Sequence, residues 1–100
     1  MIKKIKSSEI KKFIDNNPNT VLLDVRTKGE WNTFGKPDTK DLGIESFFVT
    51  ISQDPSFLEN IKKNIDKKKQ VLVMCAAGGR SIIAANLLAI EGYNTLNVSD

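Results

Sequence analysis

Residues 71–90, VLVMCAAGGRSIIAANLLAI, decide the fold class of this 100-residue chain. The stretch begins with a continuous apolar segment, VLVMC, which is typical of a strand that is buried on both faces. A short turn with two glycines follows. Residues 80–91 then have the composition of a buried helix, and Gly92 suits the position just after its end. A strand that leads directly into a helix is the repeating unit of α/β proteins with parallel sheets.

The rest of the chain repeats this alternation. Further strands are predicted near Ile2 and Ile5 and at residues 21–25, 46–51 and 95–98. Helices are predicted from Ser7 or Ser8 to about residue 16, from Thr27 through Trp31, and from Pro55 to Ile65. We therefore expect one domain over residues 1–100, a three-layer α/β fold with a central parallel sheet of about five strands and helices on both faces. The helix at 80–91 is apolar on nearly all sides, so we expect it to be well buried.

The composition excludes several kinds of chemistry. The chain has one cysteine, Cys75, and no histidine, so it can form neither an internal disulfide nor a metal site of the Cys/His type, and no histidine can act as a general base. We expect no metal and no cofactor. The N-terminus lacks the apolar core of a secretory signal, and no run approaches the roughly 18 apolar residues of a membrane helix. We therefore expect a soluble, cytoplasmic protein with a reduced thiol and no membrane partner.

The net charge of +3 includes one dense group of lysines, at positions 62, 63, 67, 68 and 69. A solvated helix end explains them, because cations complement a helix C-terminus. Nucleic-acid binding is the alternative, but no aromatic residues interleave these lysines as a single-strand binder requires. We expect no nucleic-acid partner, and a modest positive field that helps to attract small anions.

Cys75 lies where a thiol is readily activated. The N–H groups at a helix start and the helix dipole stabilise an anion, whether a bound ligand or a thiolate, and the pKa of a thiol in such a place is commonly lowered. Gly78 and Gly79 would let the turn curl so that N–H groups converge, and Arg80 adds a cation that opposes the dipole unless an anion is near. The alternative is that Cys75 is a small buried hydrophobe, Gly78 and Gly79 make only a tight turn, and Arg80 is merely exposed.

At this point the chain resembles the rhodanese-type sulfurtransferases. Residues 75–81, CAAGGRS, are similar to their active-site pattern C-x-x-G-x-R-[ST]. Residues 22–31, LLDVRTKGEW, resemble their (L/I)-D-V-R-x-x-x-E-(F/Y/W) motif, and residues 88–93 resemble their L-x-x-x-G-(Y/F) helix ending. The order and spacing of the three motifs match one rhodanese domain over residues 5–99.

The resemblance implies a five-stranded parallel sheet and a cysteine, Cys75, that accepts a sulfane sulfur as a persulfide and passes it on. Thiosulfate or another persulfide would be the donor, and cyanide, a thiol or a protein of a sulfur relay would be the acceptor. The anion would lie against the loop that follows the nucleophile, formed by Ala76, Ala77, Gly78, Gly79, Arg80 and Ser81, with Arg80 orienting the donor. Asp24 and Arg26 are expected to support the site, and Trp31 to pack.

Other functions remain open. A non-catalytic module of the same family would bind a partner protein, although such modules often lose the cysteine. The related phosphatases have C-x5-R, one residue more than CAAGGR, and a redox-sensing thiol normally needs a second, resolving cysteine. Residues 35–40, GKPDTK, differ from the family's usual G-H-(I/L)-P-G-A, which leaves the pocket wall and the substrate open. The family commonly continues past the last strand, so we expect a shortened form or a further C-terminal segment beyond Asp100.

Overall fold

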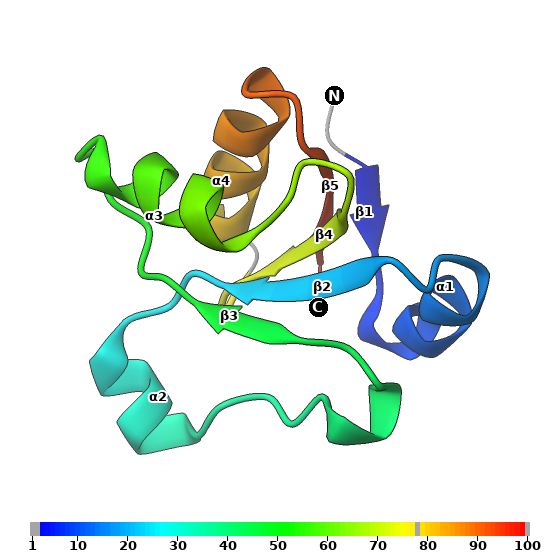
Figure 1. Cartoon of the computed structure of the whole chain (residues 1–100). Coiled ribbons are helices and arrows are strands. Elements are labelled where there is room, and N and C mark those ends of the chain that lie inside the picture. Colours follow the sequence, from blue (N-terminus) through cyan, green and yellow to red (C-terminus); the bar gives the residue numbers. More distant parts are fainter. Residues whose placement is uncertain (1–2, 78, 100) are drawn as a thin grey trace.

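A computed structural model of the chain describes residues 3–77 and 79–99. Within them, five strands pair in parallel in the order β1-β5-β4-β2-β3 (Figure 1). The strands are β1 (Lys3–Ile5), β2 (Thr20–Asp24), β3 (Ser46–Phe48), β4 (Gln70–Met74) and β5 (Asn94–Val98). The predicted five-stranded parallel sheet is confirmed, and β4, which leads to Cys75, is its central strand.

Helices lie on both sides of this sheet. They are α1 (Ile10–Asn16), α2 (Lys28–Phe34), α3 (Ser56–Asn64) and α4 (Gly79–Ile90), and two short 3-10 turns span Ser7–Glu9 and Lys40–Leu42. Side chains of α3 and α4 pack on one face of the sheet, and those of α1 pack on the other. The predicted α/β layering is therefore confirmed. No helix in the described part of the chain is long and apolar enough to cross a membrane.

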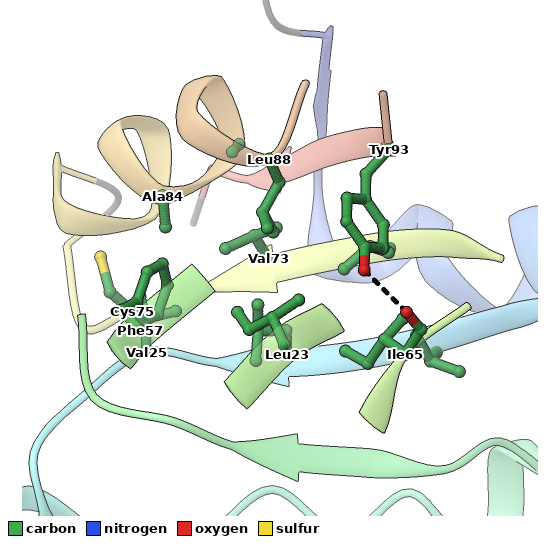
Figure 2. Close-up of a cluster of buried hydrophobic side chains, with 13 residues drawn as sticks. Leu23, Val25, Phe57, Ile65, Val73, Cys75, Ala84, Leu88 and Tyr93 are labelled. Atoms are coloured by element: carbon green, nitrogen blue, oxygen red, sulfur yellow. Dashed lines mark hydrogen bonds between the residues drawn. The ribbon is translucent and has the colours of Figure 1, made fainter. Parts of the chain in front are cut away.

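The strands divide their side chains between two cores because successive residues of a strand point to opposite faces. The larger core, under α3 and α4, contains Val21, Leu23 and Val25 beside Val71, Val73 and Cys75 (Figure 2). The smaller core contains Leu22 and Leu72 with Ile5 and Val98. At the far end of the larger core from Cys75, the Tyr93 hydroxyl donates to the Ile65 carbonyl at 2.8 Å.

The helix boundaries follow local signals in the sequence. Thr27 and Glu30 form the predicted capping box: the Glu30 N–H donates to Thr27 Oγ1 at 3.2 Å, and the Thr27 N–H donates to Glu30 Oε1 at 3.1 Å. Gly35 ends α2 with φ 83°, and Gly92 follows α4 with φ 98°, conformations that favour glycine. Pro55 directly precedes α3 with helical backbone angles.

Two predicted features are wrong in part. The strand expected at 46–51 ends at Phe48. The Val49 N–H donates to the Asp24 carbonyl, but the Ile51 N–H donates to the Val25 carbonyl, one residue short of the regular parallel step, so the ladder stops.

The second wrong feature is the burial of α4. The helix packs on the sheet through one face, which carries Ser81, Ala84, Ala85 and Leu88. Ile83 is 57% exposed and Ile90 is 82% exposed, because no described element covers the outer face of α4 at these positions.

Candidate active site

Cys75 lies at the carboxyl edge of the sheet. It directly follows β4, it is only 7% exposed, and its side chain belongs to the core under α3 and α4. The Val25 N–H donates to the Met74 carbonyl at 3.0 Å, which holds the end of β4 against the end of β2. Cys75 and Asp24 therefore lie at the same sheet edge, where ligands bind in open α/β folds.

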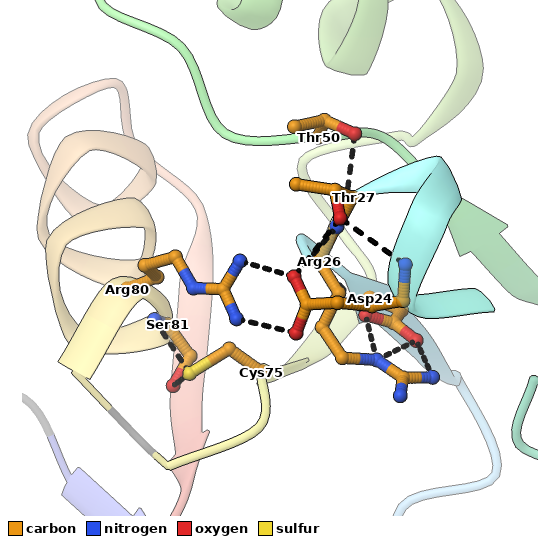
Figure 3. Close-up of polar contacts among 8 residues, drawn as sticks. Asp24, Arg26, Thr27, Thr50, Cys75, Arg80 and Ser81 are labelled. Carbon is orange, nitrogen blue, oxygen red and sulfur yellow. Dashed lines mark hydrogen bonds and ion pairs between the residues drawn. The ribbon is translucent and has the colours of Figure 1, made fainter. Parts of the chain in front are cut away.

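The Cys75 sulfur contacts the start of α4. The Ser81 N–H donates to Sγ at 3.4 Å, and the thiol lies 3.4 Å from Ser81 Oγ, to which it donates (Figure 3). The Ser81 hydroxyl in turn donates to Asn97 Oδ1. A hydroxyl has one proton, so Ser81 can direct it to Asn97 beside a thiol or to the sulfur of a thiolate. The backbone and side chain of Ser81 are thus both placed to stabilise charge on Cys75.

Asn97 is part of the site, and sequence reasoning missed it. It lies in β5 and is 1% exposed, between Leu96 and Val98. A buried polar side chain needs hydrogen-bond partners, and here the Ser81 hydroxyl is one of them. An amide in the middle of a predicted buried strand was the signal that could have found it.

The outer part of the loop is exposed at Ala76, Ala77 and Gly79, while Gly78 lies outside the described residues. Gly79 is the first residue of α4 and is not among the glycines with positive φ. A Cβ built there would meet no atom within 4 Å. The structure therefore gives no conformational reason for glycine at position 79, contrary to the role expected for it in curling the turn.

Arg80 pairs with a carboxylate of the protein itself. Arg80 Nη1 and Nη2 donate to the two carboxylate oxygens of Glu30 at 2.6 and 2.7 Å. This two-point pair lowers the pKa of Glu30 to about 2, with the Thr27 capping bonds as the next cause, and it raises the pKa of Arg80. Glu30, predicted only as a capping residue, thus also joins α2 to the start of α4.

Asp24 and Arg26 form a second, buried pair. Arg26 donates to the Asp24 carboxylate from its backbone N–H, from Nε, and from Nη2 at 2.8 Å. Arg26 Nη2 also donates to the Gly35 carbonyl at 2.9 Å, and Thr50 Oγ1 donates to the Arg26 carbonyl at 2.8 Å. The hydrogen bonds to Asp24 raise the pKa of Arg26. These contacts join β2 to the end of α2 and to the segment after β3.

The two pairs together carry no net charge. They contain two carboxylates, Asp24 and Glu30, and two guanidinium groups, Arg26 and Arg80. The two pairs also interact electrostatically, because the charge of Glu30 helps to raise the pKa of Arg26 and the charge of Asp24 helps to raise the pKa of Arg80. The cluster therefore adds no excess of positive charge to this edge of the sheet.

Lys36, in the segment that departs from the family pattern, lies over an aromatic pair. Trp31 and Phe48 meet edge to face, with ring centroids 5.5 Å apart, and Lys36 Nζ lies 4.7 Å from the Phe48 centroid. Trp31 therefore packs, as expected. Among the described residues, no group of three or more cysteine or carboxylate side chains could hold a metal ion.

Comparisons with known proteins agree with this geometry. A model of the rhodanese-like domain matches residues 7–100. The uncharacterized protein RP600 of Rickettsia prowazekii is 34% identical over 100% of this chain and 83% of its own length. The crystal structure of Rv0390 from M. tuberculosis superposes with a TM-score of 0.84 and 30% identity, covering 98% of this chain and 77% of that one.

A more distant structure has the same fold. The rhodanese-like domain protein from Staphylococcus aureus is 22% identical with a TM-score of 0.68, over 98% of this chain and 85% of that one. The sheet order, the position of Cys75 before α4 and the match over residues 7–100 lead to one conclusion. The chain belongs to the rhodanese-like domain family, a superfamily of sulfurtransferases.

Proposed function

We propose that this protein is a sulfurtransferase or sulfur carrier that works through a persulfide on Cys75. The observation that carries the proposal is the contact of Cys75 Sγ with the Ser81 N–H at 3.4 Å, at the start of α4. A backbone N–H at a helix start stabilises negative charge on sulfur, both on the attacking thiolate and on the persulfide.

The reaction needs no external oxidant or reductant. The Cys75 thiolate attacks the outer, sulfane sulfur of thiosulfate, so a new S–S bond forms on Cys75 while the S–S bond of thiosulfate breaks. Its electron pair leaves with sulfite. Cyanide or a thiolate then attacks the terminal sulfur of the persulfide, which releases thiocyanate or a new persulfide and restores the Cys75 thiolate. A protein of a sulfur relay would react in the same way as a small thiol.

The residues of the site divide into those that face the sulfur and those that hold the loop. Ser81 faces Cys75 Sγ with both its N–H and its hydroxyl. We assign the exposed residues Ala76, Ala77 and Gly79 to the wall of the anion site. Arg80 was expected to orient the anionic donor. Since Glu30 accepts from both Nη1 and Nη2, we assign Arg80 first to holding the loop, and a small anion would have to displace Glu30 to make the same two-point contact.

Intact mass spectrometry tests the proposal. Incubation with thiosulfate should add one sulfur atom to the protein, cyanide or dithiothreitol should remove it, and Cys75→Ser should show no addition. The variant should keep its fold, because serine is close in size to cysteine and its hydroxyl can hydrogen-bond Ser81 Oγ, which the thiol already contacts. A folded wild-type protein that acquires no sulfur would instead favour the non-catalytic binding module.

A further inference from the structure

Asn97 is a buried polar residue of β5 whose side chain faces α4. Its strand neighbours Leu96 and Val98 pack in the core on the other side of the sheet, and Asn97 pairs in register with Val73 of the larger core. Burying an amide costs free energy that an apolar side chain at the same position would avoid. Asn97 offsets part of this cost by accepting a hydrogen bond from the Ser81 hydroxyl.

Three side chains form a chain of hydrogen bonds that begins at the sulfur. The Cys75 thiol donates to Ser81 Oγ at 3.4 Å (Figure 3), and the Ser81 hydroxyl donates to Asn97 Oδ1. All three residues are buried. A hydroxyl has one proton, and the oxygen of an amide can only accept. While Ser81 donates to Asn97, its hydroxyl therefore presents lone pairs, and no proton, to Cys75 Sγ.

Loss of the Cys75 proton changes what the sulfur requires of Ser81. A thiolate cannot donate, so the lone pairs of Ser81 Oγ would face a negative charge. The hydroxyl can turn and donate to the sulfur only if it gives up its bond to Asn97 Oδ1, and a hydrogen bond in a buried site is stronger than one in water. In both arrangements Asn97 disfavours the thiolate, whereas the Ser81 N–H favours it.

We propose that Asn97 is a positioning residue that holds the Ser81 hydroxyl proton away from Cys75 and so stabilises the forms of the site in which Sγ carries no charge. The thiol is one such form. The persulfide is the other, because its charge lies on the terminal sulfur, and this second part rests on the proposed function. Asn97 thus lowers the reactivity of the empty site and lengthens the lifetime of the loaded one.

Charged side chains lie around this site on several elements. They are Arg80 on α4, Glu30 on α2, Asp24 and Arg26 at the end of β2, and Lys4 of β1, which lines a cavity together with Asn97. The side chains that α3 contributes to the same core are apolar. The pair of Glu30 and Arg80 lowers the pKa of Glu30 to about 2 and raises the pKa of Arg80, so both stay charged from about pH 5 to pH 9. Uncharged substitutions at position 97 leave all of these groups in place.

Alkylation of Cys75, the only thiol of the chain, tests the proposal. The rate of reaction with neutral iodoacetamide is measured against pH, and its midpoint marks the conversion of thiol to thiolate. Asn97→Leu keeps the approximate size of the side chain but cannot accept a hydrogen bond, and Asn97→Ala makes the same test with a smaller residue. The midpoint should fall by about one pH unit in both variants, the shift that one hydrogen bond of ordinary strength gives.

Two further substitutions separate positioning from packing. Thr95 lies on the same face of β5 as Asn97, and its hydroxyl donates to the Ala85 carbonyl of α4 at 3.1 Å. Thr95→Val removes this link between the strand and the helix but leaves Ser81 intact, so the midpoint should not move. Ser81→Ala removes the hydroxyl, and adding Asn97→Leu to that variant should cause no further shift. An asparagine that acts through packing alone would shift the midpoint with or without the Ser81 hydroxyl.

The lifetime of the persulfide tests the second part of the proposal. Cyanide attacks the terminal sulfur and the S–S bond breaks. Its electron pair stays on Cys75 Sγ, which becomes a thiolate as thiocyanate leaves. A thiol that ionises more readily is a faster leaving group. Asn97→Leu, loaded with thiosulfate and then freed of the donor, should therefore lose its sulfur to cyanide about threefold faster than the wild type, followed by intact mass.

The outcomes distinguish this inference from the proposed function. An unchanged or raised midpoint in folded Asn97→Leu and Asn97→Ala, or an equal shift in the Ser81→Ala background, would overturn the role of Asn97. Equal rates of sulfur release would overturn its effect on the persulfide. If thiosulfate adds no sulfur to the folded wild type, the proposed function is wrong, and the alkylation profiles still decide whether Asn97 controls the thiol.

Discussion

Removing one member of the buried pair of Asp24 and Arg26 should lower the free energy of unfolding strongly. In Asp24→Ala, Arg26 keeps the hydrogen bond from its guanidinium to the Gly35 carbonyl. It loses the carboxylate that accepts from its backbone N–H, from Nε and from Nη2. Asp24 is fully buried and Arg26 is 7% exposed, so the guanidinium of the variant would be largely shielded from water. Removing one member of a buried ion pair costs about 3–5 kcal/mol, because the other charge stays buried without compensation.

This loss is large for a domain of this size. A domain of about 100 residues is stable by roughly 5–15 kcal/mol, so Asp24→Ala should fold but with a small margin. With a urea dependence of about 1.5 kcal/mol per M, the midpoint of unfolding should fall by roughly 2–3 M. The fluorescence of Trp31, the only tryptophan, and far-UV circular dichroism should report the same transition.

A double-mutant cycle decides whether the pair itself causes the loss. Arg26→Met keeps much of the aliphatic stem but leaves Asp24 buried without the guanidinium, and should be destabilised to a similar extent. The double variant removes both charges, so its free energy of unfolding should be no lower than that of the less stable single variant. The two single losses then do not add, and the coupling energy between the side chains is about 3 kcal/mol. Additive losses, or a loss under about 1 kcal/mol in either single variant, would refute this reasoning.

The remaining predictions concern Glu30, two glycines and the core. The pair with Arg80 lowers the pKa of Glu30 from its ordinary 4.5 to about 2. The pair therefore stabilises the fold above about pH 5, and this stabilisation is lost as the pH falls toward 2. The urea midpoints of the wild type and of Glu30→Gln should converge over the same pH range. Gly92→Ala should destabilise the protein by about 1 kcal/mol or more because φ is 98°, whereas Gly79→Ala should have no such effect. Leu88→Ala, at a fully buried position, should lower the free energy of unfolding by about 2–5 kcal/mol.

The fold was largely predictable because its signals are local. The apolar runs at 21–25 and 71–75 mark strands that are buried on both faces, and each is a core strand of the sheet. The capping box of Thr27 and Glu30 and the glycine at 92 mark helix boundaries within a few residues of the chain. The length of β3 was not predictable in this way, because its end depends on hydrogen bonds to the distant residues Asp24 and Val25.

The position of the nucleophile in the candidate site was predictable from the sequence, but several of the residues around it were not. The strand, turn and helix of residues 71–90 place Cys75 at the start of α4 from the sequence alone. Asn97 was missed because its partner, Ser81, lies 16 residues away on another element. The exposure of Ile83 could not be read from an apolar helix, since burial depends on which neighbouring elements exist to cover it.

The layered α/β fold and the place of the thiol at the carboxyl end of a central strand follow from local patterns in the sequence. Hydrophobic periodicity and turn residues act over a few positions, so the helices and strands that they form can be predicted from the sequence. The surroundings of that thiol depend on contacts between distant parts of the chain. Glu30 and Arg80 are 50 residues apart, and the two-point pair that they form, from Nη1 and Nη2 to the carboxylate, could not be predicted from either local pattern. The same folding brings residues 51–53 beside α4, because hydrogen bonds and packing join segments that no local pattern connects.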